Sequence, residues 1–135
     1  FPYTTLFRSV AVGYIVASTD YKKYREIFLK KYASKIKKAY PLEYFGHAME
    51  KLWMYKLSET YPAHMHIDII DLYQKGGYGR KLINVLFNKL RNEGIKGVCL
   101  GTSKDNKNAQ GFYEHIGFKK IKTILGSEII YGYLL

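Results

Sequence analysis

The sequence predicts an α/β domain, because strand-like and helix-like segments alternate along its second half. The run Met65–Ile70 alternates apolar and polar residues, and a glycine-rich turn separates it from an amphipathic segment at Leu82–Leu90. A second strand-like run, Val98–Thr102, precedes a second amphipathic segment, Asn106–Phe118. Two β-rich runs around Gly126-Ser127 then predict a closing antiparallel hairpin. With 135 residues, 47% of them apolar, the chain can form one domain with a single core.

The glycine-rich turn Gln74–Arg80 is the element around which we expect the domain to be organised. A strand that leads into such a turn and then into a helix is a typical anion site, because the first helical turn leaves backbone N–H groups unpaired and carries partial positive charge. Its glycines are expected to let the backbone approach a ligand, which we predict to be a pyrophosphate. Leu82 stands where the dinucleotide fingerprint needs its third glycine, and the P-loop triplet Gly-Lys-Ser/Thr is absent from the sequence. The predicted ligand contacts here are Gln74, Lys75, Gly76, Gly77, Tyr78, Gly79 and Arg80.

The turn has the pattern Gln-x-x-Gly-x-Gly followed by a basic residue, which resembles the coenzyme A pyrophosphate loop of the GNAT N-acetyltransferase superfamily. Asn106, followed seven residues later by Tyr113 and then by Gly-Phe, resembles the second signature of the same superfamily. The resemblance covers roughly Ala63–Phe118. Within it, His64–Tyr113 looks like the acetyltransferase-like domains found alongside O-GlcNAc hydrolases.

This resemblance implies a mixed, mainly antiparallel sheet with helices on both faces, and acetyl-CoA as the co-substrate. It also implies an N-acetyltransferase that passes the acetyl group directly to an amine in a ternary complex. The amine is left open among small molecules, aminosugars and proteins. By resemblance, backbone groups of Ile67, Ile69 and Ile70 contact the pantetheine arm and polarise the thioester. Asn106 is expected to bond the pantetheine arm or to cap its helix, and Tyr113 is expected to protonate the leaving thiolate.

The general base is not evident from the sequence. Many relatives carry a glutamate five residues before the asparagine, and that position is Gly101 here. His66 or Asp68 are the candidate bases, because they share one face of the predicted strand with His64. No metal is predicted on that face, since no further ligand is evident elsewhere in the sequence. A catalytically silent acyl-CoA-binding domain is therefore the alternative function.

The beginning of the chain reads differently from the rest. Phe1–Ser9 matches the translation of a common sequencing adapter, and we interpret it as a non-native scar. Val10–Ser18 is expected to form a buried strand that resembles the third strand of GNAT proteins. If Val10–Ser18 corresponds to that third strand, the usual first strand, first two helices and second strand of GNAT proteins are missing. Residues 10–135 are then a partial GNAT-like domain, which predicts an incomplete and inactive enzyme fragment as one outcome.

Two helices are expected between this strand and Met65–Ile70. The first, Asp20–Tyr40, is basic, with Asp20 as its N-cap and an apolar stripe at every fourth residue. The second, Leu42–Ser58, is expected to bury one side. The members of the stripe are Tyr24, Phe28, Tyr32 and Ile36, and those of the buried side are Phe45, Met49, Leu52 and Trp53.

The net charge of +11 keeps a nucleic-acid-binding module as a third possible function. No nucleic-acid motif accompanies the charge, so a solvated basic face is the favoured interpretation. One cysteine, Cys99, excludes an internal disulfide and predicts a reducing, cytoplasmic environment; we expect it to be a small buried hydrophobe. No apolar run approaches the ~20 residues that a membrane span needs. The oligomeric state is not readable from the sequence.

Overall fold

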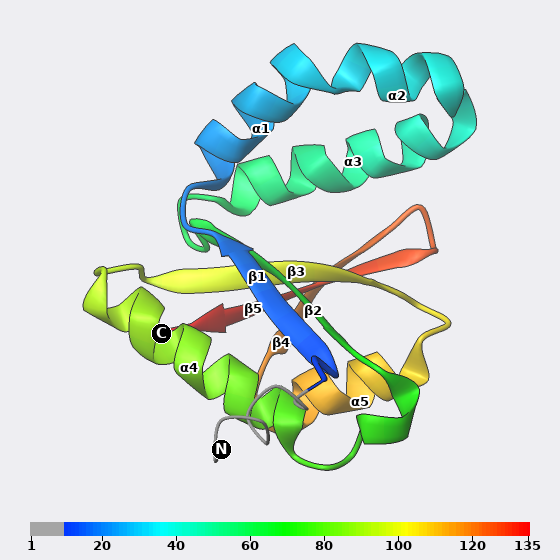
Figure 1. Cartoon of the computed structure of the whole chain (residues 1–135). Helices are drawn as coiled ribbons and strands as arrows, with labels where there is room; N and C mark the ends of the chain where they lie inside the picture. The colour runs from blue at the N-terminus through cyan, green and yellow to red at the C-terminus, as the bar shows by residue number, and fades with distance from the viewer. Residues whose placement is uncertain (1–9) are drawn as a thin grey trace, which may run out of the picture.

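A five-stranded sheet lies between two groups of helices in the computed structural model, which describes residues 10–135 (Figure 1). The predicted α/β class is confirmed, with helices on both faces of a mixed sheet. The interpretation of Phe1–Ser9 as a scar lies outside the described residues. The elements are β1 (Gly13–Ser18), α1 (Tyr21–Lys31), α2 (Ala33–Ala39), α3 (Pro41–Leu57), β2 (Ala63–Ile69), the 3-10 turn η3 (Asp71–Tyr73), α4 (Tyr78–Asn92), β3 (Gly97–Ser103), α5 (Lys107–Ile116), β4 (Lys119–Ile124) and β5 (Glu128–Leu134).

The strands are ordered β1-β2-β3-β5-β4, and every neighbouring pair is antiparallel except β2 and β3. The parallel pair is joined at only two positions, Ala63 with Val98 and His64 with Cys99. Beyond these positions the two strands diverge, so their carboxyl-terminal halves border a gap in the sheet (Figure 1). The closing hairpin predicted from the sequence is confirmed as β4 and β5.

The sheet separates two apolar cores. Helices α4 and α5 cover one face, where Met65, Ile83 and Leu100 are almost fully buried. Helices α1 and α3 cover the other face, where Tyr21 and Met54 are buried. Because side chains alternate along a strand, each strand serves both cores. The face covered by α4 and α5 is called the α4 face below, and the opposite face is called the α3 face.

The predicted helix Asp20–Tyr40 is divided in two by the structure. Asp20 caps α1 as expected, since its Oδ1 accepts a hydrogen bond of 3.0 Å from the Lys23 N–H. Tyr32 leaves the helical conformation, with φ −122°, and α2 starts again at Ala33. After this break Ala33 is buried and Tyr32 is 53% exposed, so the predicted stripe does not continue through Tyr32. The break redirects the chain toward α3.

Helix α3 begins with Pro41, a favoured first helical residue, and matches the predicted segment closely. Its buried side was predicted only in part. Met49 and Trp53 pack against the core of the α3 face, but Phe45 and Leu52 are exposed, and Met54 is buried instead. The helix is therefore rotated relative to the prediction, because its contacts are made with α1 and the sheet and could not be read from spacing alone.

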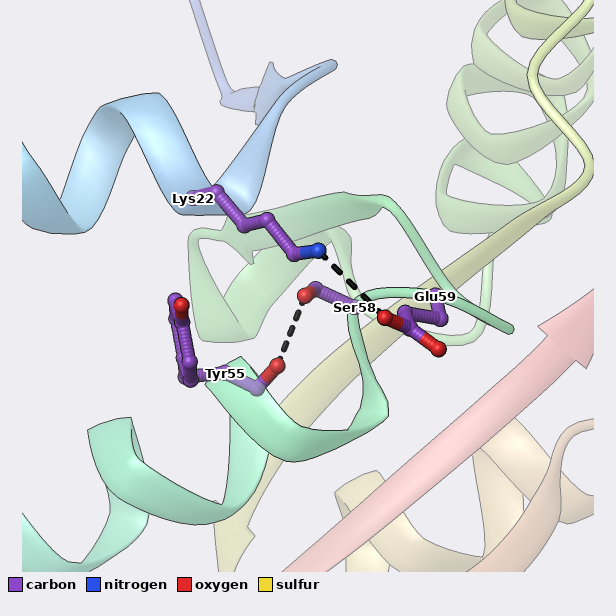
Figure 2. A network of polar contacts seen from close by, with 4 residues as sticks. All are labelled: Lys22, Tyr55, Ser58 and Glu59. Atoms are coloured by element: carbon purple, nitrogen blue, oxygen red, sulfur yellow. Dashed lines mark hydrogen bonds and ion pairs between the residues drawn. The ribbon is translucent and has the colours of Figure 1, made fainter.

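Helices α1–α3 are inserted between β1 and β2 and are called the inserted helices below. The start of α1 and the turn after α3 lie next to each other (Figure 2). The Lys22 ammonium lies 3.6 Å from the Glu59 carboxylate, and the Ser58 hydroxyl donates a 2.6 Å hydrogen bond to the Tyr55 carbonyl. The Tyr21 N–H also donates to the carbonyl of Pro62, just before β2. Helices α1–α3 thus leave and rejoin the sheet at one end of the neighbouring strands β1 and β2. Within residues 10–135, no helix combines the length and apolar character that crossing a membrane needs.

Candidate active site

A cavity of about 650 Å³ opens where β2 and β3 diverge. Its walls come from β2, from the glycine-rich turn with the start of α4, from the end of β3, and from α5. Most of the residues predicted from the sequence lie along it, whereas Ile70, Gly76 and Tyr78 are not part of its lining. The predicted residues in the lining are His66, Ile67, Asp68, Ile69, Gln74, Lys75, Gly77, Gly79, Arg80, Asn106 and Tyr113.

The backbone of β2 presents free groups to this gap. The Ile70 N–H donates a 2.9 Å hydrogen bond to the Val12 carbonyl, which fixes the alternation of the antiparallel ladder with β1. By that alternation, Ile67 and Ile69 direct their backbone groups away from β1 and toward the gap. The Ile69 carbonyl accepts a bond from the Gln74 side chain, which ties the glycine-rich turn to the strand. Ile70 already uses its N–H for Val12 and its carbonyl for Tyr73, so of the three predicted strand residues it is the least available to a ligand.

The glycine-rich turn places the start of α4 beside the cavity. Gly77 is the N-cap residue with φ +81°, a conformation that favours glycine, and a Cβ there would meet no described atom within 4 Å. Helix α4 begins at Tyr78, two residues earlier than predicted. The N–H groups of its first turn have no partner within the helix, and Lys75 and Arg80 add positive charge. The arrangement suits a pyrophosphate.

Two of the three glycines also serve packing, and one of them, Gly79, lies in the cavity lining as well. A Cβ at Gly79 would lie 2.6 Å from Cζ of Phe112 on α5, so Gly79 allows α4 and α5 to meet. A Cβ at Gly76 would lie 2.9 Å from the ring of Tyr78. Of the three, only Gly77 combines a positive φ with open space above its backbone.

We expect Gly79→Ala to destabilise the domain by about 1–3 kcal/mol, because the added methyl group would force Phe112 or α4 to move. Gly111→Ala, within α5, is the matched control. A Cβ at Gly111 meets no described atom within 4 Å, and the higher helix propensity of alanine is expected to stabilise by about 0.5–1 kcal/mol. Urea unfolding of the two variants measures both effects. Equal stability of the two variants would contradict the packing role of Gly79.

Helix α5 carries the second pair of predicted site residues. The Oδ1 of Asn106 accepts a 3.1 Å hydrogen bond from the Ala109 N–H and caps the helix. Both expected roles remain compatible, because this bond leaves the amide donors of the side chain for a ligand in the cavity. Tyr113 is 8% exposed, lies in the cavity lining and packs against Phe118 and Tyr131. Burial raises the pKa of the Tyr113 phenol to about 12, so it holds its proton at neutral pH.

The three polar residues of β2 do not act as one group. The His64 ring lies 5.4 Å from the ring of Tyr21 and 5.5 Å from that of Tyr24, under the inserted helices. His66 and Asp68 are exposed and lie in the cavity lining. Among residues 10–135, no three His, Cys, Asp or Glu side chains come together in a group that could hold a metal ion.

His64 is expected to make the domain sensitive to acid. Burial, followed by the nearby Lys51 and His66, lowers the pKa of the His64 imidazole to about 4. The unfolded chain therefore binds the extra proton between about pH 6.5 and 4, and stability is lost as pH falls through that window. From pH 7 to about pH 4.5 the loss from this group is roughly 2–3 kcal/mol. Urea unfolding should show a smaller loss in His64→Leu than in the wild type, and identical losses would contradict this origin.

Several lining residues were missed by the sequence analysis. Asn108, Phe112 and His115 are spaced by four and three residues, so they share the face of α5 that borders the cavity. This spacing was visible in the sequence, but it does not say that the face borders a ligand site. Thr102 adds a hydroxyl from β3.

A mixed sheet that opens between two parallel strands, beside a helix that starts at a glycine-rich turn, is the arrangement of an acyl-CoA-dependent acyltransferase. The chain belongs to the GNAT acetyltransferase family, whose model matches residues 43–118. This match confirms the resemblance found in the sequence, and it places the protein in the transferase class.

One solved structure resembles nearly the whole chain, and another resembles about half of it. The structure of SsHAT aligns with 95% of this chain and 68% of its own, at 26% identity and a TM-score of 0.76. A domain from Methanocaldococcus jannaschii aligns with 54% of this chain and 48% of its own, at 26% identity and a TM-score of 0.50. Since only a twentieth of the chain lies outside the SsHAT alignment, the likeness to SsHAT includes the inserted helices. The chain spans about half the length of the M. jannaschii domain.

Proposed function

We propose that this domain is an N-acetyltransferase that passes the acetyl group of acetyl-CoA directly to an amine in a ternary complex. The observation that carries the proposal is the continuous cavity from the start of α4 to the gap between β2 and β3. One end offers unpaired backbone N–H groups, and the other offers a strand edge and a phenol.

The pyrophosphate binds at the first turn of α4, over Gly77, where Lys75 and Arg80 add charge-assisted contacts. The pantetheine arm lies along β2 and bonds the backbone groups of Ile67 and Ile69 in the manner of an added strand. The Asn106 amide contributes one further bond. This orientation brings the thioester into the gap near Tyr113.

In the reaction, a backbone N–H of β2 stabilises the charge that develops on the thioester oxygen as the amine attacks. The carbon–nitrogen bond forms and the carbon–sulfur bond breaks. The departing sulfur takes the proton of the Tyr113 hydroxyl. The nitrogen loses one proton to a base and a second that restores the Tyr113 phenol. His66 and Asp68 border the cavity from β2 and are the base candidates taken from the sequence.

A catalytically silent acyl-CoA-binding domain is the second candidate, favoured by Gly101, which replaces the glutamate of many relatives. A nucleic-acid-binding role has no further support: the Lys residues of α1 and α2 are exposed, which a solvated face and a nucleic-acid footprint share. The single cysteine, Cys99, is free and buried. This fits a reducing compartment, and we propose that the protein is located in the cytoplasm.

The test is release of CoA thiol from acetyl-CoA in the presence of a panel of primary amines, with mass spectrometry of the acetylated products. The proposal expects transfer to at least one amine and loss of that transfer in Gly77→Glu. A folded chain that binds acetyl-CoA and acetylates none of the panel would support the silent domain.

A further inference from the structure

The position that lacks the family's glutamate is next to a different glutamate. Gly101 borders the cavity, and a Cβ built on it would collide with Oε1 of Glu50. The same Cβ would lie 3.1 Å from Cδ of Glu50 and 3.3 Å from Cε of Met54. Both neighbours belong to the inserted helix α3. The missing side chain at position 101 therefore leaves the space that the carboxylate of Glu50 occupies.

Glu50 lies on the α3 face, opposite the pyrophosphate end of the cavity. Leu100 is buried in the core of the α4 face, so the next residue, Gly101, is directed to the α3 face. By the same alternation on β2, His66 and Asp68 belong to the α3 face, because Met65 and Ile67 pack on the α4 face. The gap between the strands connects the two faces. Glu50 contacts Gly101 of the cavity lining, so it would lie beside an acceptor that approached the gap from the α3 face.

Two carboxylates, those of Glu50 on α3 and Glu128 on β5, interact here, and the basic His47 lies beside them. The Glu50 side chain is 17% exposed, and the Nδ1 of His47 lies 3.5 Å from its carboxylate. On β5, burial and then the charge of Glu50 raise the pKa of the Glu128 carboxyl. Burial and then the charge of Glu50 also raise the pKa values of the Tyr21 phenol on α1 and of the Cys99 thiol on β3. A protonated amine is the acceptor that such a site attracts.

We propose that Glu50, supplied by the inserted helix α3, is the general base of the acetyl transfer. This inference rests on the proposed function. The acceptor ammonium gives one proton to the Glu50 carboxylate, directly or through one water, and the neutral nitrogen attacks the thioester carbon. As the carbon–nitrogen bond forms and the carbon–sulfur bond breaks, sulfur takes the proton of Tyr113. The nitrogen's second proton then restores the Tyr113 phenol, and the proton on Glu50 passes to solvent.

The test compares two amines of similar size at neutral pH. Ethylamine is protonated there and needs a base, whereas 2,2,2-trifluoroethylamine is already neutral. Glu50→Gln is expected to slow transfer to ethylamine by about 100-fold and transfer to trifluoroethylamine by less than about 10-fold. The affinity for acetyl-CoA should not change. Glu43→Gln, on the exposed first turn of the same helix, is the matched control and should behave as the wild type for both amines.

A second variant moves the carboxylate back to the strand. Glu50→Ala combined with Gly101→Glu places a carboxylate on β3, in the space that Glu50 vacates, and should recover transfer to ethylamine at least about tenfold over Glu50→Ala alone. A merely structural Glu50 would give equal losses for the two amines and no recovery in the double variant, which would overturn the assignment. If the wild-type chain binds acetyl-CoA but acetylates no amine of the whole panel, the proposed function is refuted, and the role of Glu50 with it.

Discussion

Gly77→Glu is expected to lower the affinity for acetyl-CoA by at least about 100-fold. Gly77 is the N-cap of α4, and the space above its backbone is open. A glutamate there would place a like charge at the position that we propose for the pyrophosphate. Losing two charge-assisted hydrogen bonds costs about 3 kcal/mol or more, and each 1.4 kcal/mol is a factor of ten in affinity. Calorimetric titration measures the change.

Gly126→Glu is the control for backbone strain. Gly126 also has a positive φ, of +69°, and open space around it, but it lies in the β4–β5 turn, away from the cavity. The two variants should lose similar stability, by about 1–2 kcal/mol, because each places a side chain in the left-handed region. If both variants bind acetyl-CoA as the wild type does, the pyrophosphate does not lie at Gly77.

Tyr113→Phe is expected to lower kcat by about 100-fold while leaving the affinity for acetyl-CoA nearly unchanged. The substitution keeps the ring that packs against Phe118 and removes only the hydroxyl that we propose as the proton donor to the thiolate. Because burial raises the pKa of this phenol to about 12, the wild-type rate should not decline from loss of the Tyr113 proton below about pH 10. Steady-state kinetics with an accepted amine measure the effect.

Tyr131→Phe is the control for removing a phenol from the same aromatic cluster. Its ring centre lies 6.0 Å from that of Tyr113, but its hydroxyl donates to the Glu114 carboxylate and Tyr131 is not part of the cavity lining. It should retain kcat within a few-fold of the wild type. A Tyr113→Phe variant that is as fast as this control would mean that the thiolate leaves without help from Tyr113.

Local signals account for the part of the fold that the sequence predicted. Strand β2, the glycine-rich turn and helix α4 are adjacent in the chain. The residue composition and the spacing of the apolar residues were therefore enough to identify them. The caps Asp20 and Asn106 were predictable for the same reason, since each bonds a backbone N–H three residues later.

Contacts between distant segments account for what was missed. The role of Gly79 depends on Phe112, which comes from another helix. Gly101 is the clearest case. From the sequence it indicates a lost catalytic glutamate, but in the fold its missing side chain makes room for Glu50 of α3. The inserted helices lie before the central strand as expected, and the structure adds that α1 and α3 cover the α3 face of the sheet.

Calorimetric titration of the folded chain with acetyl-CoA tests the central claim most directly, with circular dichroism to verify that the sample is folded. The account predicts binding at a single site with an affinity in the micromolar range, and loss of that binding in Gly77→Glu but not in Gly126→Glu. The account would be contradicted if the folded chain gave no heat of binding at several temperatures and a competition assay also detected no binding of CoA.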